Sequence, residues 1–166
     1  ILLKRASALT LSYIAQHTEQ LAIPVAENGL DAITFFLSYN DTQLKRNICQ
    51  LLGNITKHSP DLATQVMAKL NNPQKLLNCL KDNDDIVKKN AAFCICEIVN
   101  KNPENAQAIC SAGGPGILVD FITNIKGDPR LYGILSLGFI SAFKDDLAMS
   151  VIQAKAISQL RDALQN

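Results

Sequence analysis

The sequence contains no tryptophan, only two histidines and two methionines, and aromatic residues make up 5% of its 166 residues. The sequence also has no large excess of charge of either sign. It contains 16 Lys and Arg and 15 Asp and Glu, which gives a net charge of +1. Obligate nucleic-acid binders usually carry a clear basic excess to neutralise phosphates. The balance therefore argues against nucleic acid as the main partner.

Long hydrophobic runs are missing as well. The longest uncharged stretches, 106–119 and 131–143, are shorter than the roughly 20 residues that a membrane-spanning helix needs. No secretory signal opens the chain, and it begins with Ile1 instead of Met. We therefore expect no membrane partner, and we expect the chain to be an internal portion of a longer protein.

Recognisable sites for chemistry are few. The five cysteines match no C-x-x-C metal motif, and we interpret them as small buried side chains in a reducing compartment. Residues 113–116 are glycine-rich but lack the Lys-Ser/Thr of a phosphate loop, and the acidic run 82–85 lacks the Gly and Glu of a calcium loop. His17 and His58 occupy one repeat position, which indicates a structural role. We predict a protein that is not an enzyme and uses no cofactor or metal.

An internal repeat is the strongest signal in the sequence. Four isoleucines lie 41, 43 and 42 positions apart: Ile14, Ile55, Ile98 and Ile140. An alanine follows each by eight positions, and a basic residue precedes each by ten positions, namely Lys4, Lys45, Lys88 and Arg130. A period near 42 is typical of armadillo or HEAT arrays or of propeller blades. The apolar residues recur with helical spacing, which excludes the blades.

Each unit divides into three predicted helices. Long helices are expected over 3–16, 42–57, 85–101 and 129–143, short ones over 19–28, 60–69, 103–112 and 145–154, and third helices over 31–39, 73–81, 115–125 and 156–164. Gly29 and Gly113 mark predicted breaks at positive φ. The predicted capping residues are Asp41, Ser59, Asp84, Asn102 and Asp128.

Three helices per unit favour armadillo over the two-helix HEAT unit. We predict an all-α, right-handed armadillo-type superhelical solenoid, one segment with units at about 1–41, 42–84, 85–126 and 127–166. Its cut ends should expose apolar surface, so the chain is expected to be a monomer or to associate weakly end to end.

The long helices of such a solenoid would line a concave protein-binding groove. Armadillo import adaptors resemble this chain there, and they grip an extended peptide with Trp and Asn. At those places this chain has Leu9 and Tyr13, Gln50 and Asn54, Phe93 and Glu97, and Leu135 and Phe139. Only Asn54 matches, which argues against a receptor for nuclear localisation signals.

A basic residue stands one turn before the Trp-equivalent position in three units: Arg5, Arg46 and Lys89, with Leu131 in the fourth. Residues four apart share a helix face. These residues form either a basic ladder for an extended acidic peptide or an ordinary solvated face. The sequence leaves both interpretations open.

Longer segments point to one armadillo family. Residues 57–63, Lys-His-Ser-Pro-Asp-Leu-Ala, and residues 79–91, 111–114 and 130–134 resemble the sperm-associated antigen six family of the ciliary central pair apparatus. The third and fourth copies depart from the 57–63 phrase. The resemblance implies a structural scaffold needed for motility, located in cytoplasm, cytoskeleton and the axoneme of cilia or flagella. It implies central-apparatus proteins as partners, with acidic tubulin tails as one candidate ligand. The alternative is a general peptide-binding adaptor in transport or adhesion.

Overall fold

The computed structural model describes residues 1–165, and these residues form eleven helices and no strand. Four long helices lead the units: α1 (Leu2–Ala15), α3 (Thr42–Thr56), α6 (Asp85–Lys101) and α9 (Arg130–Phe143). The remaining helices are α2 (Glu19–Phe36), α4 (Pro60–Leu70), α5 (Gln74–Cys79), α7 (Pro103–Ser111), α8 (Gly114–Asn124), α10 (Asp145–Gln153) and α11 (Ala156–Gln165). The all-α prediction is confirmed.

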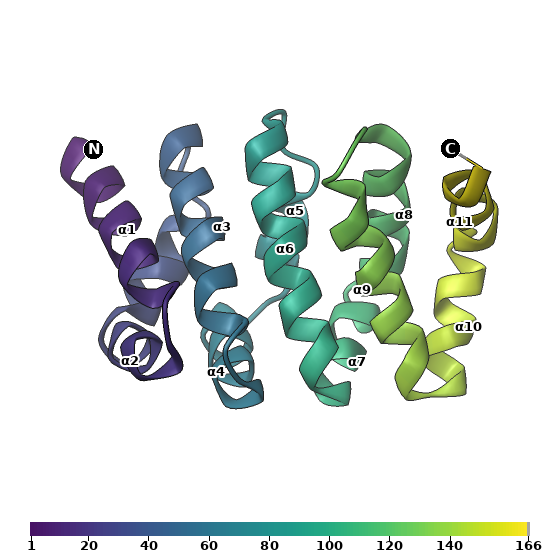
Figure 1. The fold of residues 1–166 in the computed structure, drawn as a ribbon, viewed down its shortest axis with the longest axis horizontal. Helices are drawn as coiled ribbons and strands as arrows, with labels where there is room; N and C mark the ends of the chain where they lie inside the picture. Colours follow the sequence, from purple (N-terminus) through teal and green to yellow (C-terminus); the bar gives the residue numbers. More distant parts are fainter. Residues whose placement is uncertain (166) are drawn as a thin grey trace.

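The helices form a row of stacked units (Figure 1). The long helices lie side by side in chain order, each packed against the next. Most of the other helices lie behind them, and α10 and α11 close the row at the C-terminal end. The two termini lie at opposite ends of the row. Within the described part of the chain, no helix is both long and apolar enough to cross a membrane. The predicted solenoid of three-helix units is confirmed.

The repeated isoleucines form part of a continuous core. Ile55, Ile98 and Ile140 are fully buried between neighbouring units, whereas Ile14, in the first unit, is 40% exposed. An α-solenoid buries each unit only against its neighbours, so the unit at an end keeps one apolar face uncovered. Leu3 and Leu164 lie at the two ends and are strongly exposed for the same reason.

Most helix starts follow the predicted caps. The Asp41 carboxylate accepts a hydrogen bond from the Leu44 amide at 2.8 Å, and Asp84, Ser59 and Asn102 cap their helices similarly. The prediction for Asp128 is wrong. Helix α9 begins only after Pro129, and no side chain of the described residues caps it.

The predicted break at Gly29 is also wrong, because α2 continues through it to Phe36 and merges the second and third helices of the first unit. A glycine inside a helix costs only about 1 kcal/mol, and the buried stripe that includes Leu30 and Ile33 continues past it. Gly113 does adopt the predicted left-handed conformation, with φ of 78°. In the second unit the break falls at Asn71, with φ of 58°.

Candidate protein-binding groove

The exposed face of the first long helices contains a hollow of about 340 Å³. Five of the predicted groove residues line it: Leu9, Tyr13, Arg46, Gln50 and Asn54. Helix α6 contributes Ile86 and Asn90 to the same hollow. We call this feature the α1–α3 hollow. The helical repeat therefore brings these five residues together, although they come from two units of the chain.

Arg5 is not a free cation in this groove. Its Nε donates to Asp41 Oδ1 at 3.0 Å and its second nitrogen to Oδ2 at 2.6 Å. Asp41 is the residue that caps α3, so one carboxylate starts the second long helix and binds the first. The Arg5 guanidinium lowers the pKa of Asp41, and it is the largest cause of that shift.

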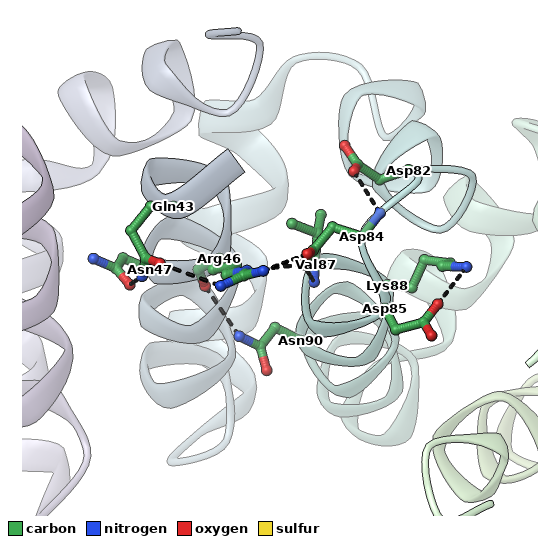
Figure 2. A network of polar contacts seen from close by, with 9 residues as sticks. All are labelled: Gln43, Arg46, Asn47, Asp82, Asp84, Asp85, Val87, Lys88 and Asn90. Atoms are coloured by element: carbon green, nitrogen blue, oxygen red, sulfur yellow. Dashed lines mark hydrogen bonds and ion pairs between the residues drawn. The ribbon is translucent and has the colours of Figure 1, made fainter. Parts of the chain in front are cut away.

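Arg46 repeats this arrangement one unit later. It binds both carboxylate oxygens of Asp84, the cap of α6, and Nε lies 2.9 Å from Oδ1 (Figure 2). Another Arg46 nitrogen donates to Gln43 Oε1 at 3.3 Å. The Arg46 hydrogen bond is the main cause that lowers the pKa of Asp84 to about 2. Asp41 and Asp84 are the last residues of the predicted units 1–41 and 42–84, and each caps the long helix of the next unit. Because they link one long helix to the next, we call Arg5–Asp41 and Arg46–Asp84 the inter-unit ion pairs.

These ion pairs revise the proposed basic ladder. Arg5 and Arg46 each pair with the carboxylate that caps the next long helix, so they are neither free to bind a peptide nor simply solvated. Lys89 differs, since it is exposed and has no partner among residues 1–165. Of the three basic residues, only Lys89 is therefore unpaired within residues 1–165. The fourth unit has Leu131 at this position and adds no cation.

A set of asparagine contacts also joins the units, and sequence analysis missed it. The Asn47 amide donates to the Arg5 carbonyl at 2.9 Å, and Asn90 donates to the Arg46 carbonyl at 3.0 Å. The signal was present, because both asparagines directly follow a groove cation one period apart. Asn54, which matches the import adaptors, is 4% exposed and donates to the Ser12 carbonyl at 3.1 Å.

Apolar side chains form the far part of the groove. The half-buried Phe93 ring lies against Gly53 of the preceding unit, and its centroid is 5.4 Å from that of Tyr132 in the next unit. Leu135 is 38% exposed, and Phe139 is half-buried. The third and fourth units are thus joined by aromatic packing on this face.

Glu97 is the one carboxylate among the predicted groove residues. It is half-buried, and Lys101 lies 3.8 Å away. Burial is the main cause that raises the pKa of Glu97. The ion pair with Lys101 reduces its capacity to attract a basic ligand.

The histidines and cysteines include one structural contact and one thiol pair, in which Cys49 and Cys79 share a side-chain hydrogen bond. His58 Nε2 lies 2.7 Å from the Ala15 carbonyl of the preceding unit, which fits a structural role. Across residues 1–165 no three His, Cys, Asp or Glu side chains are placed to hold one metal ion. Four cysteines are buried, and Cys110 is half-buried.

Known proteins resemble this chain only locally in sequence. A HEAT-repeat family profile matches residues 74–101, which span α5 and α6 and are less than half of the chain. No curated protein sequence matches the chain. Sequence similarity therefore identifies one repeat-like helix pair.

Solved structures match nearly the whole chain. One designed armadillo repeat protein superposes with a TM-score of 0.89 at 22% identity, over 94% of this chain and 66% of its own. The fold is an armadillo-type repeat solenoid. A second designed armadillo protein, in complex with the peptide (KR)4, gives 0.90 at 20% identity over 97% and 67%. A computationally designed armadillo protein for modular peptide recognition gives 0.92 at 22% identity over 97% and 68%. This armadillo-type chain thus spans about two thirds of each match.

Proposed function

We propose that this solenoid is a non-catalytic scaffold whose long-helix face binds an extended segment of another protein. The α1–α3 hollow carries the proposal. Leu9 and Tyr13 are 37% and 56% exposed there, although the stacked units bury most other large apolar side chains. Exposed apolar side chains gathered in a hollow are typical of interaction sites.

The structural matches support this proposal at the level of the fold. One matched protein is seen with a bound peptide, and another was designed for peptide recognition. The fold itself presents neighbouring long helices as a continuous surface along which an extended chain can run. The ligand of this chain has to be argued from its own residues, because it is only 20% and 22% identical to these two proteins.

We further propose a setting in the central apparatus of motile cilia or flagella. The support is the resemblance of residues 57–63 and 79–91 to the sperm-associated antigen six family. A structural role there requires protein contacts and no chemistry, which suits a solenoid. The alternative is an adaptor in transport or adhesion, which the same groove would serve.

Two measurements test these proposals separately. A fluorescently tagged protein that contains these repeats is expected at the axoneme of cells with motile flagella, and signal confined to cytoplasm or nucleus would reject the ciliary setting. The Tyr13→Arg variant should lose most partners captured by the wild-type chain from flagellar extract, while Gln65→Arg on α4 should keep them. Equal capture by both variants would reject the groove.

A further inference from the structure

The groove carries almost no unpaired charge across its first two units, and this feature restricts its ligand. An extended acidic peptide would need Arg5 and Arg46 as partners. Both arginines already bind a carboxylate with two nitrogens, which is the geometry that makes such pairs strong. The bound aspartate already neutralises each guanidinium, and a carboxylate that took over either two-nitrogen pair would uncap the helix that Asp41 or Asp84 begins.

Amide groups in the α1–α3 hollow are mostly satisfied in the same way. Asn47 and Asn54 donate to the first unit, and the Asn90 amide donates to the second. Gln43 donates to Asn47 and accepts from Arg46. These side chains hold the units together and keep little capacity for a ligand.

Gln50 is the exception in this hollow. Its side chain is half-buried, and it has no hydrogen-bond partner within residues 1–165. A side-chain amide offers both a donor and an acceptor, which match the carbonyl and amide that an extended main chain presents to one side. The Gln50 amide can bond to water in the free chain, and a bound peptide would replace that water with its main chain.

Three largely apolar side chains stand among the polar residues that line the hollow. Leu9 and Tyr13 border the hollow on α1, and Ile86 borders it on α6 with 47% of its surface exposed. Side chains of an extended peptide alternate in direction, so those pointing inward would meet these three residues. Apolar inward side chains would then bury surface on both partners.

We propose that the α1–α3 hollow binds an extended, uncharged protein segment, with the Gln50 amide on its main chain and its alternate apolar side chains on Leu9, Tyr13 and Ile86. The proposal rests on the proposed function and names its ligand class. It differs from the import adaptors in two respects. The asparagine that matches theirs, Asn54, serves the inter-unit contact, and a glutamine one turn earlier binds the ligand.

The probe is a displayed library of random nine-residue peptides selected against the 166-residue chain. We expect enriched peptides to carry apolar residues at alternate positions and to lack Asp, Glu, Lys and Arg between them. Affinities for a synthesised winner are then measured by fluorescence anisotropy. Gln50→Ala should weaken binding about tenfold, the size of one good hydrogen bond, while Gln65→Ala on α4 should leave it unchanged.

The outcomes separate this inference from the proposed function. The selection could instead enrich acidic or basic peptides that bind the Tyr13→Ala variant less well than the wild type. That result would contradict an uncharged ligand but would still support binding in the groove. Unchanged affinity in Gln50→Ala would remove the glutamine contact. A selection that yields no binder, or only binders that ignore both Tyr13→Ala and Gln50→Ala, would overturn the groove and with it the proposed function.

Discussion

Arg46 binds both carboxylate oxygens of Asp84, which lies 38 residues later and caps the next long helix. The Asp84 side chain thus both caps the start of α6 and binds α6 to Arg46 of α3. Arg5 and Asp41 do the same one unit earlier. Much of the charge on the groove side of the first two units is therefore used to align the units.

Removing the Asp84 carboxylate should destabilise the array. In Asp84→Ala, α6 loses its cap and Arg46 loses its partner, and the cap alone is worth about 1 kcal/mol. Asp85→Ala is the matched control, because Asp85 is exposed and its one ion pair among residues 1–165 is with Lys88 in its own helix. Urea unfolding followed by circular dichroism should show a lower midpoint for Asp84→Ala only. Equal midpoints for the two variants would show that the inter-unit contact adds nothing.

Asp84 should also make stability depend on pH. Its pKa is about 2 in the folded chain against an ordinary value of 3.8, so the folded state favours the ionised form. The stability gained is present above about pH 4 and is lost as the pH falls towards 2. In Asp84→Asn, which keeps a capping side chain, the loss between pH 5 and 2 should shrink by about 1 kcal/mol after allowance for solvent screening. Parallel pH profiles for wild type and variant would contradict the ion pair.

Gly53 should tolerate no side chain, because a Cβ there would lie 2.5 Å from the Phe93 ring. Gly53→Ala is expected to destabilise the chain by about 1–3 kcal/mol, since the ring must leave its packed position between Gly53 and Tyr132. Gly138 holds the same repeat position in α9, and among the described residues nothing lies within 4 Å of its Cβ position. Gly138→Ala should instead stabilise by about 0.5–1 kcal/mol. Thermal unfolding of the pair measures both signs, and Phe93→Leu should partly rescue Gly53→Ala.

The cysteines should label in order of exposure. Cys94 is fully buried and burial raises the pKa of its thiol, whereas Cys110 is half-buried. Iodoacetamide at pH 8, followed by mass spectrometry, should modify Cys110 first and leave Cys94 intact until urea unfolds the chain. Cys110→Ser should abolish the fast phase. Labelling of Cys94 at the rate of Cys110 would show that the units open far more readily than the packing implies.

The sequence was sufficient to predict the repeat units, but it did not reveal the side-chain contacts that join one unit to the next. Ile55, Ile98 and Ile140 recur because each fills the same core position, so their spacing predicted the solenoid. The helix continues through Gly29 because α2 packs against α3 and α4, and this packing outweighs the low helix propensity of one glycine. Reasoning along one helix placed Arg46 in the groove but could not show its partner in the next unit. Asp128 resembles the caps of the earlier units, yet Pro129 and the turn at Gly127 start α9 without it.

The most direct test of a peptide-binding groove is an NMR titration of the isotope-labelled chain, whose 18.1 kDa suits the method, with a peptide selected from the library. The account predicts saturable chemical-shift changes in α1 and α3, largest at Leu9, Tyr13 and Gln50, and none of comparable size in α4, α7 or α10. Saturable changes centred on those outer helices would contradict it, because the ligand would then bind the opposite layer of the solenoid.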